Sequence, residues 1–210
     1  MLEIKNITKQ FGEEQVLKAL SLKLGEGEIL SILGKSGSGK STLLKIIAGL
    51  EAAADGALLL DGKDISNQAT QDRKIVYMYQ EPLLFPHLDV RENLAFGLSV
   101  RGESSELISE KTAVMLKALQ LEEQAEKMPH QLSGGQKQRV NFGRAMIIEP
   151  RLVLLDEPFG NLDSQTREAM QELFIKVARE QGITALFVTH DVKEALQVGT
   201  RYGFLERGQL

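Results

Sequence analysis

The sequence predicts an α/β fold, in which a parallel β-sheet carries helices on its faces, and three observations support this prediction. First, short apolar runs typical of strands buried in a parallel sheet occupy residues 28–33, 152–156 and 184–189. Second, residues 42–50 follow the first run with apolar side chains at helical spacing. Third, Leu20, Leu22 and Leu24 alternate with polar residues, which indicates an antiparallel β portion near the N-terminus.

The composition is that of an ordinary globular protein, and it argues against several classes of function. The chain has 210 residues, the size of one domain with ample length to bury a core. Its net charge of −4 argues against a broad basic surface, so we expect no nucleic-acid partner. There is no cysteine, which excludes disulfides and thiolate metal sites. No apolar run approaches the length of a membrane span, and the first residues are typical of a strand rather than of a signal peptide.

Residues 34–41 match the pattern G-x-x-x-x-G-K-[ST] of a phosphate-binding loop, and they stand between a predicted strand and a predicted helix, as that motif requires. Gly37 and Gly39 let the backbone direct its N–H groups at one anion, and the helix N-terminus adds its dipole. We expect Lys40 to reach the β- and γ-phosphates and the Ser41 hydroxyl to bind Mg²⁺. A glycine-rich turn that matches by chance is the weaker alternative. The loop residues expected at the phosphates are Gly34, Lys35, Ser36, Gly37, Ser38, Gly39, Lys40 and Ser41.

Asp156 and Glu157 stand at the end of a predicted strand, where parallel sheets bind their ligands. We expect Asp156 to hold Mg²⁺, directly or through water. Glu157 is expected to orient and polarise a water that attacks the γ-phosphate. An ordinary acidic turn at the end of a strand is the alternative, and it is the weaker one beside a phosphate-binding loop. The pair therefore indicates a nucleotide hydrolase.

Residues 132–136, Leu-Ser-Gly-Gly-Gln, predict a second anion site. Ser133 is a suitable N-cap for the helix that follows, and Gly134 and Gly135 leave the first N–H groups of that helix bare. Because one chain needs only one triphosphate cradle, we expect this half-site to serve a second copy of the protein in a head-to-tail, two-fold pair. A plain helix cap within a loop is the alternative, and without the other motifs it would be preferred.

In their order along the chain, residues 34–41, 132–136 and 152–157 resemble the motifs of the ATP-binding-cassette (ABC) ATPases, and residues 132–136 are similar to the signature sequence of that family. The resemblance covers essentially the whole chain. It implies a P-loop NTPase (RecA-like) core, Mg²⁺-dependent hydrolysis of ATP, and a dimer in which two chains sandwich the nucleotide. Besides the phosphate-binding loop, the residues that it implies at the nucleotide are Val16, Thr42, Ser133, Gly134, Gly135 and Gln136.

The resemblance also assigns four single residues outside these motifs. Phe11 stands where the family has an aromatic residue that stacks on adenine; a core phenylalanine is the alternative. Gln80 matches the glutamine that reaches Mg²⁺ and the attacking water, and His190 matches the switch histidine that contacts the γ-phosphate. Asp163 matches a loop that crosses the dimer interface, and it is also a suitable N-cap.

The helical pattern over about residues 81–149 predicts an inserted subdomain that carries the signature sequence. About residues 1–80 and 150–210 are expected to form the nucleotide-binding core with its antiparallel β subdomain. The whole chain, 1–210, is then one ATPase domain. The sugar-type importers of the family add a regulatory β-domain, and we expect no C-terminal regulatory domain here.

Two details concern packing inside the insert. Val114, Met115, Ala118 and Leu119 are expected to share one buried helical stripe. The helix after the signature sequence departs from the family pattern at Asn141 and Phe142, where relatives usually have small residues. We expect these two residues to repack the helix without touching ATP.

The segment Gln80–Leu88 indicates a biological role. Its apolar residues stand between Pro82 and Pro86, which hold it out of regular structure, and exposed Leu and Phe side chains would form a docking patch. A buried loop is an equally good alternative. The segment and the following residues 89–98 are similar to importers of the sugar, polyamine, sulfate, molybdate and ferric-iron group, in which this region faces a helix of a membrane-spanning subunit. The resemblance implies a peripheral ATPase at the cytoplasmic face of the cell membrane, which powers import through separate permease subunits.

Three other classes of function stay open on the sequence. An ATPase of an export or lipoprotein-release system is one, although the Phe-Pro-His sequence at residues 85–87 argues mildly against it. A soluble cassette protein of DNA repair or chromosome maintenance would need long coiled-coil insertions or a basic face. A module that binds ATP without turnover conflicts with the intact Lys40, Asp156, Glu157 and His190. In this family, other subunits select the transported solute.

Overall fold

Two β-sheets of different types lie side by side in the structure, a computed structural model that describes all 210 residues. The smaller sheet is antiparallel, with the strand order β2-β1-β4-β5. Its strands are β1 (Leu2–Phe11), β2 (Glu14–Leu24), β4 (Asp55–Leu60) and β5 (Lys63–Asp64). The larger sheet is parallel, with the order β6-β7-β8-β3-β9. Its strands are β3 (Ile29–Leu33), β6 (Val76–Met78), β7 (Leu152–Asp156), β8 (Thr184–Thr189) and β9 (Arg201–Phe204).

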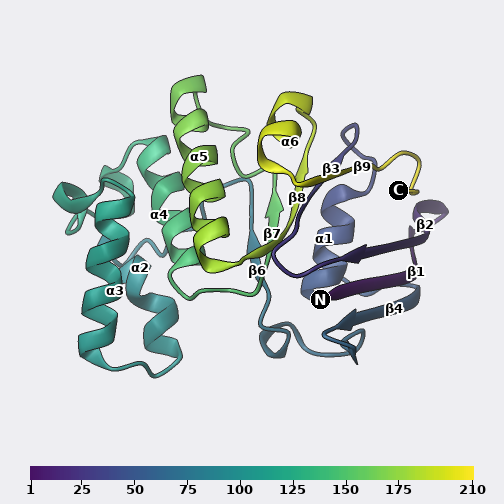
Figure 1. The fold of residues 1–210 in the computed structure, drawn as a ribbon, viewed down its shortest axis with the longest axis horizontal. Coiled ribbons are helices and arrows are strands. Elements are labelled where there is room, and N and C mark those ends of the chain that lie inside the picture. Colours follow the sequence, from purple (N-terminus) through teal and green to yellow (C-terminus); the bar gives the residue numbers. More distant parts are fainter.

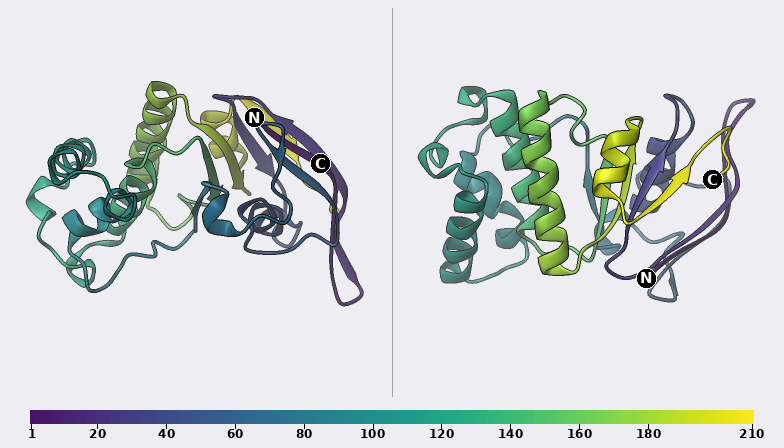
Figure 2. Two further views of the ribbon diagram at one scale, coloured as in Figure 1. Left: turned by 90° about the horizontal axis from the view of Figure 1, so that it is seen from below. Right: turned by 45° about the horizontal axis from the view of Figure 1, so that its top comes forward.

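The helices surround the parallel sheet unevenly. They are α1 (Lys40–Ala48), α2 (Val90–Val100), α3 (Ser105–Ala118), α4 (Gly134–Met146), α5 (Ser164–Gln181) and α6 (Val192–Val198), with single 3-10 turns at Thr70–Asp72, Glu122–Gln124 and Pro129–Gln131. In Figure 1, α2, α3 and α4 gather at one end of the molecule, the antiparallel sheet forms the other end, and the parallel sheet lies between them. The two further views in Figure 2 keep this order. The predicted α/β fold with an antiparallel β portion and an inserted helical part is therefore confirmed.

The central strands are apolar at every position because both faces of the parallel sheet are covered. In β7, Val153 and Leu155 pack into a core shared with α5 and the helical part of the chain. Leu152 and Leu154, which point to the opposite face, pack into a second core shared with α1 and the antiparallel sheet. Two-sided burial of this kind gives the unbroken apolar runs that predict a parallel sheet.

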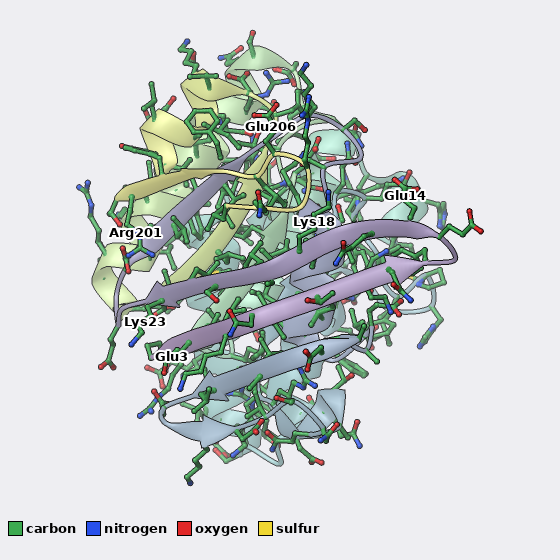
Figure 3. All side chains as sticks on the ribbon, turned by 90° about the vertical axis from the view of Figure 1, so that its right-hand side faces the viewer. Glu3, Glu14, Lys18, Lys23, Arg201 and Glu206 are labelled. Atoms are coloured by element: carbon green, nitrogen blue, oxygen red, sulfur yellow. The ribbon has the colours of Figure 1, made fainter.

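The antiparallel sheet has one buried face and one solvated face. Leu2 and Ile4 of β1 are buried against the second core. Glu3, between them, points outward and pairs across the strands with Lys23 of β2, its partner in the register, at 2.7 Å. Figure 3 shows this outer face with Glu3 and Lys23 side by side among many charged side chains. The predicted alternation of Leu20, Leu22 and Leu24 belongs to the same half-buried sheet, since all three are buried in the second core while Ser21 and Lys23 are exposed.

The buried stripe of α3 differs from the prediction. Met115 and Leu119 are buried as expected, but Val114 is 64% exposed and Ala118 is also exposed. The buried positions of this helix instead include Thr112 and Leu116. They follow the spacing of a narrow stripe that packs against α2, and Val114 lies on the solvent side of that stripe.

The departures from the family pattern in α4 concern packing. Asn141 and Phe142 are both buried, and the Phe142 ring meets Phe174 of α5 edge to face, with ring centroids 6.3 Å apart. None of the helices combines the length and the apolar character that crossing a bilayer requires.

Candidate active site

The phosphate-binding loop joins β3 to α1 at the carboxyl edge of the parallel sheet. Gly39 stands immediately before the helix with φ at 100°, and no side chain caps the helix start. The N–H groups of Lys40, Ser41 and Thr42 consequently have no acceptor within the chain. Free N–H groups at the start of a helix form an anion site. Gly37, with φ at 80°, supplies the other left-handed turn of this loop.

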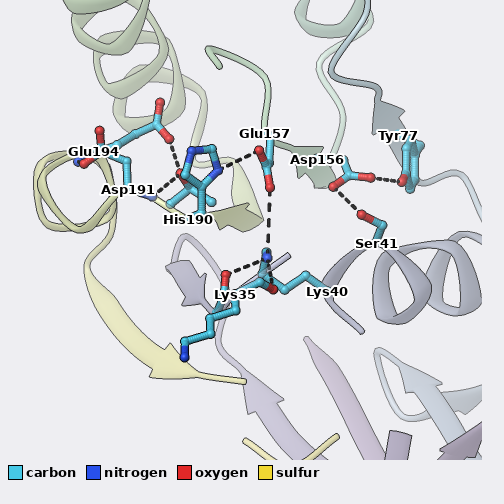
Figure 4. Close-up of polar contacts among 11 residues, drawn as sticks. Lys35, Lys40, Ser41, Tyr77, Asp156, Glu157, His190, Asp191 and Glu194 are labelled. Carbon is cyan, nitrogen blue, oxygen red and sulfur yellow. Dashed lines mark hydrogen bonds and ion pairs between the residues drawn. The ribbon is translucent and has the colours of Figure 1, made fainter. Parts of the chain in front are cut away.

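Lys40 is buried, with its ammonium group held inside the loop. Its Nζ donates to the carbonyl oxygens of Gly34 at 2.7 Å and Lys35 at 3.0 Å, and it lies 4.0 Å from Glu157 Oε1 (Figure 4). The Lys35 side chain points away from this group and is exposed. The loop therefore presents one buried cation, and not two, to an anion.

Ser41, at the first turn of α1, faces Asp156 at the end of β7. The Ser41 hydroxyl donates to Asp156 Oδ1 at 2.9 Å, and the Tyr77 hydroxyl on the neighbouring strand β6 donates to Oδ2 at 2.7 Å (Figure 4). Burial, and then the hydrogen bond to Asp156, raise the pKa of the Tyr77 phenol, so it remains a donor. Both oxygens of the carboxylate are oriented by hydroxyl groups from other elements.

Glu157 turns away from Asp156 and toward a different pair of residues. Its backbone adopts the left-handed conformation, φ 46°, which is uncommon for a residue with a side chain and typical of strained functional positions. Its Oε2 lies 2.8 Å from His190 Nδ1, and His190 follows directly after β8. The two adjacent carboxylates thus separate, one toward Ser41 and one toward Lys40 and His190 (Figure 4).

The other residues predicted at the nucleotide lie around this centre. Val16 packs against Gly39, where an added Cβ would meet Val16 Cγ1 at 3.1 Å. Phe11 is half exposed at the end of β1, beneath the Lys9 ammonium at 4.8 Å from the ring, so it is not a core residue. The Gln80 side chain is exposed and makes no hydrogen bond in the chain; its Nε2 lies against Gly160, in the loop that follows Glu157.

The signature sequence begins α4 and is not part of the same cluster. The Ser133 hydroxyl accepts from Gln136 N at 3.3 Å, and Gln136 Oε1 accepts from Ser133 N at 2.9 Å. This reciprocal capping box occupies two donors. As predicted, Ser133 is the N-cap, and Gly134 and Gly135 keep N–H groups without an acceptor. In Figures 1 and 2, α5 separates α4 from α1, so the signature sequence lies apart from the phosphate-binding loop of its own chain.

Asp163 is the N-cap of α5, as one of its two predicted roles requires. Its carboxylate accepts from Thr166 N at 3.0 Å, and this backbone hydrogen bond lowers the pKa of the Asp163 carboxyl. Thr166 also packs on Gly135, where an added Cβ would lie 3.1 Å from its methyl group. The starts of α4 and α5 are therefore neighbours.

A hollow of about 690 Å³ opens on the phosphate-binding loop. It is lined by Leu33, Gly34, Lys35, Ser36, Gly37, Ser38, His190, Val192, Phe204, Leu205, Glu206 and Arg207. A larger groove of about 1200 Å³ lies at the amino ends of β6 and β7, with acidic and basic residues mixed along its wall. Because ligands of parallel sheets bind at the carboxyl ends of the strands, the smaller hollow is the candidate site.

The residues present fit a nucleoside triphosphate with Mg²⁺. The uncapped start of α1, the buried Lys40, and the Ser38 hydroxyl, which is buried without a partner, all suit phosphate oxygens. Ser41 and Asp156 offer adjacent hard oxygen atoms, the donors that Mg²⁺ prefers when phosphates complete its coordination.

A glycine-rich loop at a helix start, a buried lysine and a carboxylate pair at the carboxyl edge of a parallel sheet define a nucleotide-binding P-loop domain. The sequence model of the family described as "ABC transporter" matches residues 17–160. The chain belongs to this family.

Named relatives and solved structures agree with this membership. The chain is 44% identical to the sulfate/thiosulfate import ATP-binding protein CysA of Methylococcus capsulatus, over all of the chain and 61% of that protein. It is 42% identical to the spermidine/putrescine import ATP-binding protein PotA of Nitrosomonas europaea, over all of the chain and 58% of that protein. The chain therefore spans about three fifths of the length of these relatives. A dimeric, post-hydrolysis structure of the ATP-binding cassette MJ0796 bound to ADP and Pi has a TM-score of 0.89 at 36% identity, with 100% of this chain and 96% of that chain covered.

The structure adds residues that the sequence prediction missed. Tyr77 orients Asp156 from 79 positions away in the sequence. Glu194 and Gln171 form a buried hydrogen bond behind His190. Tyr77 could have been predicted near the site, since it lies on the strand that leads to Gln80. Gln171 and Glu194 lie in no motif.

Proposed function

We propose that this chain is the ATP-binding and ATP-hydrolysing subunit of an ABC importer, and that a separate membrane-spanning partner carries the solute. The observation that carries the proposal is the meeting of Lys40, the Ser41–Asp156 pair and the Glu157–His190 pair at one edge of the parallel sheet. The names of the relatives divide between sulfate/thiosulfate and spermidine/putrescine import. The proposal accordingly specifies import and leaves the solute open.

The chemistry proposed is the in-line attack of water on the γ-phosphate of ATP. Glu157 orients and polarises that water, and His190, hydrogen-bonded to Glu157, contacts the γ-phosphate. Lys40 and the free N–H groups of the loop and α1 stabilise the charge that develops on the phosphate oxygens. Ser41, Asp156 and Gln80 hold Mg²⁺, which supplies further positive charge to those oxygens.

The proposed site is complete only in a dimer. Within one chain, the Gly134 and Gly135 N–H groups have no acceptor and lie away from the phosphate-binding loop. In a head-to-tail pair these groups and Ser133 face the γ-phosphate bound by the partner, with Asp163 at the interface. The two MJ0796 cassette structures are dimeric, which supports a dimer for this chain as well.

The segment Gln80–Leu88 is the proposed docking surface for the membrane-spanning subunit. Leu83 is 53% exposed, and Phe85 packs on the half-exposed Phe96 with ring centroids 4.3 Å apart. Arg144 of α4 fixes this surface from below, since it donates to the Leu83 carbonyl at 2.6 Å and stacks on the Phe85 ring. The segment starts at Gln80, so docking is coupled to the nucleotide site. We place the chain at the cytoplasmic face of the membrane as a peripheral subunit.

The proposed division of labour follows the fold. Residues 1–80 and 150–210 bind and hydrolyse the nucleotide, and residues 81–149 present the signature sequence and the docking surface. Adenine stacks on Phe11, whose ring is exposed at the end of β1, while Val16 and Thr42 line the nucleotide beside the loop.

The test is phosphate release by the purified chain, with Glu157→Gln as the comparison. Wild-type protein is expected to release phosphate from ATP only with Mg²⁺ present. Glu157→Gln is expected to bind ATP with unchanged affinity, to lose at least about 100-fold in turnover, and to accumulate as an ATP-bound dimer. Turnover near the wild-type rate in Glu157→Gln would refute the assignment.

A further inference from the structure

A buried polar cluster lies directly behind His190, and the proposed chemistry does not use it. Its members are Thr189 at the end of β8, Glu194 on α6 and Gln171 on α5, with exposed fractions of 1%, 5% and 2%. The Thr189 hydroxyl donates to Glu194 Oε2, and Gln171 Nε2 donates to Glu194 Oε1 at 3.1 Å. Each carboxylate oxygen of Glu194 is thus held by a different element.

The cluster fixes the short turn that carries His190. The Asp191 carboxylate accepts from the N–H groups of Lys193 at 2.8 Å and Glu194 at 3.2 Å, and Asp191 N donates to the Thr189 hydroxyl at 3.1 Å. Figure 4 shows Asp191 and Glu194 beside His190, on the side away from Glu157. These hydrogen bonds hold the backbone on both sides of His190, and the exposed ring points toward Glu157, with Nδ1 2.8 Å from Oε2.

Helix α5 connects this turn to the loop after Glu157. One helical turn before Gln171, Arg167 donates to the carbonyl oxygens of Leu162 at 2.8 Å and Phe159 at 3.3 Å. Arg167 and Gln171 are four residues apart, so they lie on one face of the helix. Helix α5, which Asp163 caps, therefore contacts both the loop after Glu157 and the turn that carries His190.

Stability alone does not explain a buried carboxylate, because removing the charge from water costs free energy. Burial raises the pKa of Glu194, although its hydrogen bonds from Thr189 and Gln171 oppose that shift. Proteins that carry well-packed apolar side chains at such positions are often as stable or more stable. The Glu194 carboxylate has two acceptor oxygens, and its hydrogen bonds from Gln171 and Thr189 link α5 to β8.

We propose that Glu194 is a positioning residue for the switch histidine: by accepting from Thr189 and Gln171, it locks the His190 turn to α5. His190 and the loop carrying Asp163 then move as one body when a second chain approaches. This inference rests on the proposed function of His190, and it identifies the residue that keeps the His190 ring beside Glu157.

The experiment compares two substitutions of nearly equal size at one position. Glu194→Met removes both acceptors, whereas Glu194→Gln keeps one and supplies a donor that a flipped Gln171 amide can accept. In Glu194→Met we expect kcat for ATP hydrolysis to fall about 10- to 100-fold through misplacement of His190, with KM for ATP within about twofold. In Glu194→Gln we expect kcat within about threefold of wild type. Gln171→Leu is a second variant, in case Glu194→Met does not fold, because it cuts the link from the α5 side.

A second readout is independent of activity. The chain has three histidines, so ¹⁵N spectra of histidine-labelled protein report the His190 ring separately. We expect one fixed tautomer in wild type and Glu194→Gln, and an averaged ring signal in Glu194→Met and Gln171→Leu. Unchanged kcat and ring signals in both broken variants would overturn the inference, as would equal losses in Glu194→Gln and Glu194→Met. If wild-type protein hydrolyses no ATP, the proposed function fails, and the ring signals still decide the positioning role.

Discussion

The starts of α1 and α4 are both glycine-rich, yet they are built for different tasks. Helix α1 follows Gly39 in a left-handed conformation and has no side-chain cap, so three successive N–H groups are free. Helix α4 follows Ser133 and is closed by a capping box with Gln136, which leaves two free N–H groups. The first is a complete anion site with a buried lysine at its centre. The second is a partial site, and in the proposed dimer its free groups receive an anion from another chain.

The largest expected effect tests the lysine that distinguishes the two helix starts. Lys40→Ala removes the buried ammonium that Gly34 and Lys35 carbonyls hold in the loop. We expect ATP to bind the isolated chain about 100-fold more weakly, measured by calorimetry, because a charge-assisted contact to phosphate is lost. Lys35→Ala is the matched control, since its side chain points out of the loop, and binding within about twofold of wild type is expected. Equal losses in both variants would mean that the loop acts through net charge alone.

The next effect concerns the backbone of the first site. An alanine at position 39 would have to adopt φ near 100°, and its Cβ would lie 3.1 Å from the Val16 carbonyl oxygen. Gly39→Ala is therefore expected to lower the free energy of unfolding by about 1–3 kcal/mol, read from denaturant titration, and to weaken ATP binding as well. A variant of wild-type stability would show that the loop is less constrained than its conformation indicates.

A smaller effect is expected at the cap of the second site. Ser133→Ala loses the hydroxyl that accepts from Gln136 N, which costs about 1 kcal/mol of stability. ATP binding to the isolated chain should stay unchanged, because Ser133 does not touch the loop of its own chain. The ATP-dependent dimer should weaken about tenfold, as measured by light scattering over a concentration series. Weaker binding of ATP to the monomer would break the distinction between the two helix starts.

The smallest effect serves as the counterpart of Gly39. Gly134 opens α4, its φ is not positive, and an added Cβ would meet no atom within 4 Å. Gly134→Ala is expected to raise the free energy of unfolding by about 0.5 kcal/mol or less, since alanine suits a helix better than glycine. The two glycine substitutions, measured under one set of conditions, separate a strained loop from a plain helix start.

The sequence was sufficient where the signal is local and fell short where it is not. The phosphate-binding loop, the strands that precede Asp156 and His190, and the caps at Ser133 and Asp163 follow from residues within a few positions of each other. The Tyr77–Asp156 contact joins residues 79 apart, so nothing local reports it. The α3 stripe was misjudged at Val114 because spacing gives the width of an apolar face but not its direction, which packing against α2 sets.

The start of α4 was predicted in part. Ser133 predicts the cap, and the two glycines after it predict free N–H groups, and the structure has both. The return hydrogen bond from Ser133 N to the Gln136 side chain is the part that the prediction did not include. The structure shows that capping and anion binding share the same few N–H groups, so the number of free donors depends on which side chain folds back. The number of free N–H groups at the start of α4 sets how strongly this helix can bind an anion by itself.

The central claim is that each nucleotide is enclosed by the phosphate-binding loop of one chain and the signature sequence of another. Mixing two inactive variants tests it directly: Lys40→Ala, which lacks the first half, and Ser133→Arg, which blocks the second. Random head-to-tail pairing gives mixed dimers with one intact site each, so about a quarter of the wild-type number of sites returns. We predict that phosphate release in the equal mixture rises well above the sum of the two separate variants, toward that fraction. A mixture no more active than this sum would contradict the shared site.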